Sequence, residues 1–336
     1  MAAAISKAER TYIQTSLKSN PPLRADGRSL YDFRSVLLET GVAPLANGSA
    51  RLNIGKSPEE GGGGTEVIAA TKLEVENVEN GDGQDGGRIV CTVTCSPAAY
   101  PQLSMNALDD LQYDYTTVLH QILSHPSLHP KNLEIIPKKK SWLLSLDLVI
   151  LSDAGNIYDA LFMAARGALW DTKVPITRAV QYTAKKTGEV VRAVEEALGS
   201  ESVGSSGLDT RQLPAAADFE LMDYWDEGEP LDGNDLWPVC ITLNVHETTH
   251  FLDATLLEES SVPSKLLLVF SFPPSSASRI QAVRTIGSGE LQPLHVQTLI
   301  PEAEKYARQL NSALNGKLKD EDVRRNQKAR NIFANR

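Results

Sequence analysis

The chain of 336 residues has little cysteine, few aromatic residues and no long apolar run. Three cysteines cannot form a disulfide framework, and an odd number favours a reducing compartment. Cys91 and Cys95 lie four residues apart in a strand-like run, which predicts two core side chains, because zinc-binding pairs have a tighter spacing and a second pair. No run is long enough to span a bilayer, and the N-terminus is amphipathic and does not resemble a secretory signal. These absences predict a soluble intracellular protein.

An excess of basic residues is also missing. The net charge of −10 argues against a polyanion-binding surface over the whole molecule, although a local basic lining shared with partner subunits stays possible. The charge is unevenly spread: residues 199–236 read as a solvated acidic insertion, and residues 317–336 form a basic tail. The sequence predicts one domain that covers residues 1–336. Its core runs from about residue 24 to 316 and contains the acidic insertion.

The best-defined unit of the sequence is a strand, a turn and a helix. Leu143–Leu151 is an apolar run with polar residues at a spacing of two, which predicts a largely buried strand. Gly155 and Asn156 end it, since both accept positive φ at low cost. From Ile157 apolar residues recur at helical spacing until Pro175. The turn is where an α/β enzyme would hold a phosphate, but it offers backbone N–H groups and no cation.

Further elements follow from apolar periodicity. Residues 65–75 and 88–95 are rich in β-branched residues and predict two strands, with 76–87 as the Gly- and Asp-rich tip of a hairpin. The glycine run at 61–64 lacks the lysine and helix of a phosphate-binding loop and predicts a flexible connection. Other strands are predicted at 35–38, 50–54, 239–245, 251–255 and 266–272, and helices at 3–17, 106–125 and 302–314. Runs of strands with few helices indicate an α+β fold.

A zinc-peptidase motif is matched by letter at His246, Glu247 and His250. The chemistry of H-E-x-x-H requires a helix, which brings both histidines to one face beside the metal. The residues before it alternate and are β-branched, and those after it read as extended. The motif is therefore predicted to lie in a hairpin turn, and no metal site is expected.

Three separated segments together resemble the RNase PH-like family. Residues 23–28, followed by Phe33 and Arg34, are similar to its R-x-D-G-R opening. Residues 139–175 resemble its central strand, turn and helix, and residues 252–259 resemble its L-D-P-T-x-E-E-E strand. Their order and spacing cover almost the whole chain. The resemblance implies an RNase PH-like fold with duplicated β/α halves, also called ribosomal protein S5 domain 2-like.

The same resemblance implies an assembly. Its expected partners are other RNase PH-like ring subunits of the eukaryotic RNA exosome core, OB-fold/KH cap subunits above the ring, a hydrolytic exonuclease below it, and single-stranded RNA threaded through a central channel. It implies RNA processing and degradation from the 3′ end, including rRNA maturation and mRNA turnover. It further implies no cofactor, no membrane contact, and residence in the nucleus, nucleolus and cytoplasm.

Catalytic features of the family are degenerate in this chain. Phosphorolytic members carry a Gly-Thr/Ser-Arg turn, where this chain has Gly155, Asn156 and Ile157, so a phosphate would meet no guanidinium. They also carry an E-D-S-x-x-x-x-D pattern; here Glu259 stands at the first place and Lys265 at the second. A lysine cannot replace an acid that handles the leaving oxygen. The chain is therefore expected not to be an enzyme.

Candidate RNA contacts are basic residues outside the degenerate positions, and each could equally be a plain surface charge. They are Arg24, Arg28, Arg88, Lys138, Lys139 and Lys140. On the helix at 106–125, archaeal ring relatives place channel-facing arginines, and this chain has Gln112, Thr116 and His120. The alternatives to a non-catalytic ring subunit are an active phosphorolytic 3′–5′ exoribonuclease, a metallopeptidase and a solitary scaffold.

Overall fold

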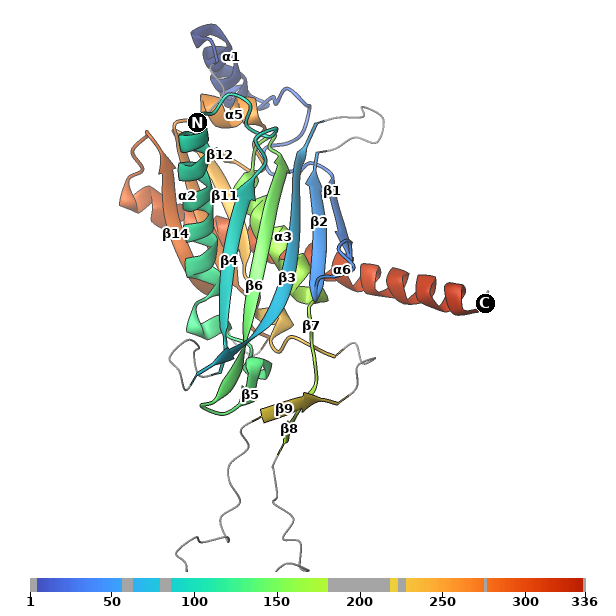
Figure 1. Cartoon of the computed structure of the whole chain (residues 1–336). Coiled ribbons are helices and arrows are strands. Elements are labelled where there is room, and N and C mark those ends of the chain that lie inside the picture. Colours follow the sequence, from blue (N-terminus) through green and yellow to red (C-terminus); the bar gives the residue numbers. More distant parts are fainter. Residues whose placement is uncertain are drawn as a thin grey trace, which may run out of the picture.

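The computed structural model describes residues 5–55, 63–78, 86–180, 218–222, 228–274 and 277–334. Within these ranges, no helix has both the length and the apolar character needed to cross a membrane. Across the same ranges, the chain forms two main sheets with helices between and around them, together with two small two-stranded ladders (Figure 1). The glycine run at 61–62, most of the acidic insertion and the tip between the strands at 65–75 and 88–95 lie outside the described residues.

The first sheet is organised around β6 (Lys140–Ser152), which contains the buried strand predicted at Leu143–Leu151. Its strand order is β1-β2-β3-β6-β4, with β5 also paired to β6. All of its pairs are antiparallel except β4 with β6, which are parallel. The other bounds are Val36–Thr40 for β1, Gly48–Ile54 for β2, Thr65–Asn77 for β3, Arg88–Cys95 for β4 and Glu134–Ile136 for β5.

The predicted hairpin of β3 and β4 is wrong. Both strands exist at the expected residues, but β6 lies between them, antiparallel to β3 and parallel to β4. Alternation of apolar residues defines the two faces of a strand and says nothing of its neighbours. The chain reaches β6 from β4 through α2 (Met105–Leu123) and two short 3-10 turns at Pro126–Leu128 and Lys131–Leu133.

Helix α3 (Ile157–Asp171) is buried along nearly its whole length. One side packs on β2 and β3, and the other packs on the second sheet. A helix covered on both sides must be apolar all round and must carry small residues where backbones approach. A Cβ on Gly167 would lie 2.9 Å from Cβ of Ala50, so glycine is required there for the close contact of α3 with β2. The strand, turn and helix predicted for 143–175 are confirmed.

Helix α2 closes the free edge of β4. Gln112 Oε1 accepts from Cys95 N at 2.9 Å, Thr116 Oγ1 from Val93 N at 3.0 Å, and His120 Nδ1 from Cys91 N at 3.3 Å. These three side chains recur every four residues and so lie on one face of the helix. An edge strand presents unpaired N–H groups that need an acceptor. The three residues therefore face the edge of β4.

The second half of the chain builds an antiparallel sheet of order β12-β11-β13-β14. Its bounds are Val239–His246 for β11, Thr249–Phe251 for β12, Ser264–Ser271 for β13 and Arg279–Gly287 for β14. The strand predicted at 251–255 ends at Phe251, because Thr255 caps the short helix α5 (Leu256–Ser261) in a capping box with Glu258. The strand β14 was not predicted.

The helix predicted at 302–314 and most of the basic tail form one helix, α6 (Pro293–Ala334). The prediction of a separate basic tail at 317–336 is therefore corrected: these residues, as far as Ala334, continue α6. The apolar stripe continues through Leu314 and Leu318, both buried. Beyond it, Trp170 Nε1 donates to Asp322 Oδ2 at 2.9 Å, so tertiary contacts extend the helix past the predicted end. In Figure 1 its C-terminal part projects from the body.

The remaining described elements are small. Helix α1 (Lys7–Lys18) is capped by Ser6 and Glu9. The bases of the acidic insertion form the ladders β7 with β10 and β8 with β9. Their bounds are Lys173–Val174 for β7, Thr177–Val180 for β8, Asp218–Leu221 for β9 and Glu229–Pro230 for β10, with a 3-10 turn at Asn234–Leu236.

Candidate functional site

The turn between β6 and α3 is held in a conformation that few sequences accept. Gly155 has a φ of +98°, and a Cβ there would lie 2.5 Å from Ala254 O. Asn156 also has positive φ and caps α3 from the left-handed region. Thr65 Oγ1 donates to Gly155 O at 2.6 Å and accepts from Ala154 N at 3.1 Å. The glycine and asparagine identified from the sequence are thus required by the backbone of the turn.

A carboxylate of the chain itself lies at the N-terminus of α3. Glu259 Oε1 accepts from Asn156 N at 2.7 Å, and Glu259 Oε2 pairs with Lys265 Nζ at 2.5 Å. The positive end of a helix dipole favours an anion there. The structure brings together four positions that the sequence analysis compared with the family's catalytic residues: Gly155, Asn156, Glu259 and Lys265.

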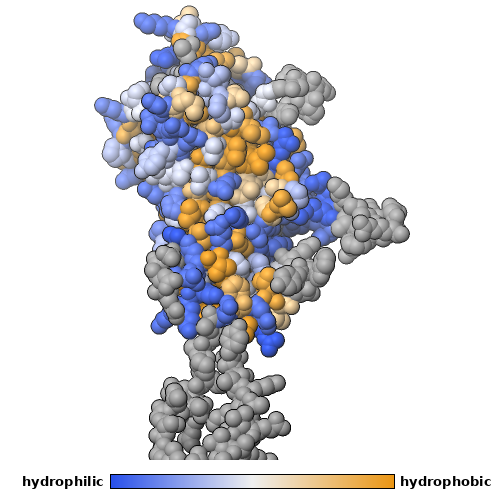
Figure 2. Space-filling model, in the orientation of Figure 1, coloured by the Kyte–Doolittle hydropathy of each residue, from blue (hydrophilic) through white to orange (hydrophobic). Residues whose placement is uncertain are grey.

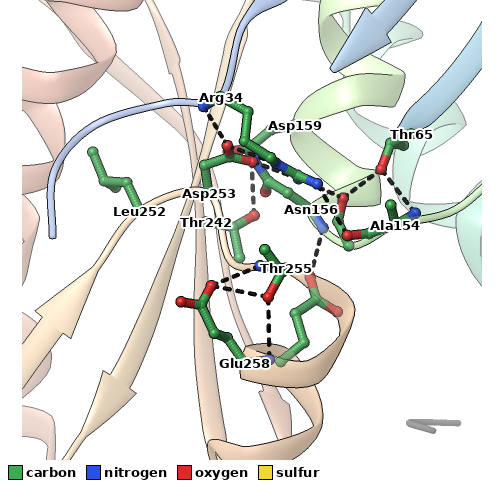
Figure 3. A network of polar contacts seen from close by, with 12 residues as sticks. Arg34, Thr65, Ala154, Asn156, Asp159, Thr242, Leu252, Asp253, Thr255 and Glu258 are labelled. Atoms are coloured by element: carbon green, nitrogen blue, oxygen red, sulfur yellow. Dashed lines mark hydrogen bonds and ion pairs between the residues drawn. The ribbon is translucent and has the colours of Figure 1, made fainter. Parts of the chain in front are cut away.

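Asp253 is the hub of the network in Figure 3. Its side chain is fully buried and receives Arg34 Nη2 at 2.7 Å and Arg28 Nη1 at 2.9 Å. It also accepts from Arg34 N at 2.6 Å and from Asn156 Nδ2 at 3.0 Å. Burial works to raise the pKa of Asp253, but the hydrogen bonds and charge of Arg34, with the charge of Arg28, outweigh it and hold the pKa below its usual value. Its ionised form therefore ties the N-terminal segment to the α3 turn.

Arg24 lies inside the chain. Its Nη2 and Nε donate to Glu258 at 2.6 and 2.9 Å, and its guanidinium lies over the ring of Phe251. The side chain is 0% exposed, which argues both against an RNA contact and against a plain surface charge at Arg24. Arg28, 14% exposed, spans Asp26 and Asp253. The R-x-D-G-R segment and the segment at 252–258 are thus two halves of one contact.

The other candidate RNA contacts lie at the opposite end of β6. Arg88 is in register with Leu143, near the start of the strand. Lys140 begins β6, pairs with Asp218 at 2.8 Å and lies over the ring of Phe219. At ~3.3 Å per residue, the length of β6 puts these residues roughly 40 Å from the turn. Arg88, 43% exposed, pairs with Glu76; Lys138 and Lys139 precede Lys140 in the tight turn from β5. The six candidates therefore do not form one site.

The H-E-x-x-H motif lies in the β11–β12 hairpin, as predicted. His246 is opposite Thr249, while His250 is opposite Val245. Neighbouring residues of a strand point to opposite faces, so the two histidines lie on different sides of the hairpin. Glu247 pairs with Lys18 at 2.6 Å, and burial lowers the pKa of both histidines. Across the described ranges, no three His, Cys, Asp or Glu side chains are grouped so as to hold a metal.

A cleft of about 270 Å³ opens beside the α3 turn, between α2 and the second sheet. The degenerate positions Asn156, Ile157, Glu259 and Lys265 form part of its wall. Sequence reasoning missed the rest of its polar lining, because these residues come from separate elements and carry no shared motif. They are Tyr100, Gln102, Asp114, Tyr115, Asp153, Tyr158 and Thr242.

Beneath the cleft lies a buried acid. Asp159 Oδ1 accepts from Thr242 Oγ1 at 2.7 Å, while its Oδ2 is buried without a hydrogen-bond partner. Burial raises the pKa of Asp159 to about 7, although the hydrogen bonds from Thr242 and Asn156 work in the opposite direction. The carboxyl sits between α3 and β11 and therefore titrates near neutral pH.

The observed fold is similar to that of RNase PH-like proteins, and a family model matches part of the chain. Residues 32–175 match the family model described as 3′ exoribonuclease family, domain 1. The fold class expected from the three sequence segments, an α+β RNase PH-like fold, is confirmed.

The particular relatives are exosome components. The chain is 24% identical to the putative exosome complex exonuclease RRP42 of Dictyostelium discoideum, over 94% of this chain and 98% of the relative. It is 32% identical to the exosome complex component Rrp42 of Thermoplasma volcanium, over 53% of this chain and 64% of the relative. These similarities confirm the resemblance to ribosomal-RNA-processing protein 42.

Solved structures show the same fold. A chain of the Archaeoglobus fulgidus exosome with RNA bound to the active site matches 91% of this chain and 97% of its own length, with a TM-score of 0.62 at 21% identity. A chain of an archaeal exosome core matches 92% and 96%, with a TM-score of 0.59 at 20% identity.

Proposed function

We propose that this chain is a non-catalytic RNase PH-like subunit of the hexameric exosome ring. In this role it supports the ring and helps to channel RNA during 3′–5′ processing and degradation, including rRNA maturation and mRNA turnover. The proposal draws on relatives named as exosome components, one of which aligns with almost the full length of both chains.

The observation that carries the non-catalytic assignment is the position of Glu259. An enzyme that uses phosphate must bring that anion to the α3 turn, where the family places a cation. Here the N–H of Asn156 already holds the Glu259 carboxylate, and Lys265 neutralises that carboxylate. An incoming phosphate would meet a like charge and would have to break a hydrogen bond and an ion pair. An active phosphorolytic enzyme is therefore not favoured.

We place the contact with ring neighbours on the outer face of the first sheet. Leu37, Val149 and Leu151 point away from α3 and are 36–49% exposed. Figure 2 shows a hydrophobic area on this side of the molecule. An antiparallel or mixed sheet with an uncovered apolar face fits a contact with another protein. We expect the isolated subunit to dimerise or aggregate for this reason.

The wider assembly is part of the same proposal. Its partners would be other RNase PH-like ring subunits, OB-fold/KH cap subunits, a hydrolytic exonuclease below the ring and single-stranded RNA, in the nucleus, nucleolus and cytoplasm. Candidate RNA contacts remain Arg88 and the lysines from Lys138 to Lys140, which gather at one end of β6 away from the Asp253 network.

Affinity purification of the tagged protein from its own cells, followed by mass spectrometry, tests the ring role. We expect several RNase PH-like chains, cap proteins and a large nuclease in near-equal amounts. Recovery of the bait alone would contradict the proposal and favour a solitary scaffold.

A second assay tests the absence of catalysis. Purified protein is incubated with poly(A) and inorganic phosphate, beside an active phosphorolytic RNase PH-like enzyme as positive control. We expect no nucleoside diphosphate from this chain. Release of diphosphates that persists in Glu259→Gln would contradict the non-catalytic assignment without touching ring membership.

A further inference from the structure

The edge strands of the two main sheets are covered or short, with one exception. Side chains of α2 close the edge of β4, and α6 packs against β1, where Leu38 and Thr40 are buried. The strands β5 and β12 have three residues each. Proteins cover or shorten edge strands because their unpaired N–H and C=O groups invite another strand. An edge that is left long and open is therefore a candidate binding surface.

The exception is β14, which ends the strand order of the second sheet. It has nine residues, and its register with β13 is unbroken from Ala282 to Gly287, after a bulge that skips Gln281. Among the described residues, β13 is the only element that hydrogen-bonds to the β14 backbone. The other edge of β14 therefore keeps N–H and C=O groups for an added strand.

The side chains of β14 also fit an added strand. Ala282 and Ile286 pack against the main core. Because successive side chains of a strand point to opposite faces, Val283 and Thr285 lie on the other face, where both are exposed, Val283 to 46%. β-branched residues pair well with neighbours on an adjacent strand. At an edge that must stay unpaired, lysine or proline would be expected in their place.

We propose that β14 is a docking edge for an extended acidic segment of a protein partner, which adds to the second sheet as a further strand. Main-chain hydrogen bonds supply the affinity in such a contact, and alternate side chains supply the specificity. The contact lies on the second sheet, apart from the outer face of the first sheet that we assign to ring neighbours. It goes beyond ring membership and does not depend on it.

The charges of β14 select an acidic partner. Its charged residues are Arg279 and Arg284, and it has no carboxylate. Arg284 pairs with Asp114 at 2.6 Å, while the exposed Arg279 has no ion pair within the part of the chain that the structure describes. A second copy of this chain would bring two arginine-bearing edges together. Like charges on paired strands are unfavourable, whereas carboxylates on an added strand would pair with the arginines.

The test is hydrogen exchange of the full chain, read by mass spectrometry, with three capped peptides. They are Glu-Val-Glu-Val-Glu-Val, its counterpart Lys-Val-Lys-Val-Lys-Val, and the acidic peptide with every amide N-methylated. We expect the acidic peptide to slow exchange at residues 282–287 and to bind roughly tenfold more tightly than the basic one. The N-methylated peptide keeps the side chains and the charge but cannot donate to β14, so its binding should be lost.

Two matched variants locate the site. Val283→Glu puts a carboxylate on the open edge and should weaken binding of the acidic peptide by roughly fivefold or more. Val323→Glu makes the same change at a side chain of α6 that is 55% exposed and should leave binding unchanged. The comparison of the three peptides uses the native chain, so it decides the question even if Val283→Glu does not fold.

Several outcomes would overturn the inference. They are no protection of residues 282–287 by the acidic peptide, equal binding of the acidic and basic peptides, retained binding of the N-methylated peptide, or equal effects of Val283→Glu and Val323→Glu. Dimerisation of the full chain that Val283→Glu abolishes would also contradict it, because the occupant would then be a second copy. None of these results bears on the recovery of ring partners, so the ring proposal fails or stands separately.

Discussion

The Asp253 network makes the sharpest prediction about stability. Replacing Asp253 by Asn keeps the shape of the side chain and removes its charge. Arg34 and Arg28, 11% and 14% exposed, would then lie in the interior without their shared carboxylate. Breaking one side of a buried ion pair costs about 3–5 kcal/mol, because the remaining charge stays desolvated. We expect the free energy of unfolding to fall by about that amount at pH 7.

Urea unfolding followed by circular dichroism measures the change, and Asp26→Asn is the matched control. Asp26 also pairs with Arg28, at 2.6 Å, but its side chain is 34% exposed. An exposed ion pair contributes about 0–1 kcal/mol. If Asp253→Asn were no more harmful than Asp26→Asn, the argument that the buried carboxylate organises this part of the chain would be refuted.

The pH dependence gives a second check on the same variant. The pKa of Asp253 lies below its ordinary value of about 3.9, so its contribution is present above that pH and is lost as the pH falls through the folded pKa. The difference between the native protein and Asp253→Asn should therefore be full at pH 7 and shrink below about pH 4. A difference that stays constant to lower pH would show that charge is not its cause.

Three further predictions concern the core. Thr116→Val leaves Val93 N without its acceptor and should lower the free energy of unfolding, measured in urea, by about 1–3 kcal/mol. Thr117→Val, on the exposed face of α2, should lower it by less than about 1 kcal/mol. Equal losses would contradict the conclusion that α2 closes the edge of β4. Gly167→Val should cost about 1–3 kcal/mol or more by overpacking against Ala50, and a neutral thermal melt would contradict that contact. Burial raises the pKa of Asp159 to about 7, so its ionisation destabilises the fold as the pH rises from about 4 to 8. Relative to the native protein, the free energy of unfolding of Asp159→Asn should be higher by roughly a few kcal/mol more at pH 8 than at pH 5. Parallel curves of unfolding free energy against pH for the two proteins would contradict this.

Local chemistry made parts of the site predictable. Gly155 and Asn156 were identified because a strand must end and a helix must begin there, and the structure gives both residues positive φ. The H-E-x-x-H motif was placed in a hairpin because the residues before it alternate between apolar and polar, as in a strand, and this pattern can be seen in residues next to one another in the sequence. By contrast, Arg24 was one of the candidate RNA contacts, since nothing in its own segment shows that Glu258 and Phe251 enclose it.

The cleft could not be predicted from the sequence, for the same reason. Asp114 comes from α2, Asp153 from the turn after β6 and Glu259 from α5, and no spacing links them. Gln112, Thr116 and His120 show the converse case: their helical spacing was visible, but whether that face meets a channel or the edge of β4 depends on where α2 packs.

The sequence by itself determined the position of β6 and α3, the bend between them, and an α+β chain whose segments resemble RNase PH. These features depend on residues close together along the chain, through side-chain periodicity and backbone preference. Only the tertiary structure decided that β6 lies between β3 and β4, that α6 continues through the basic tail, and that Glu259 occupies the N-terminus of α3. Those features depend on which surfaces meet, and the free energy of burial that selects them comes from residues far apart in the sequence.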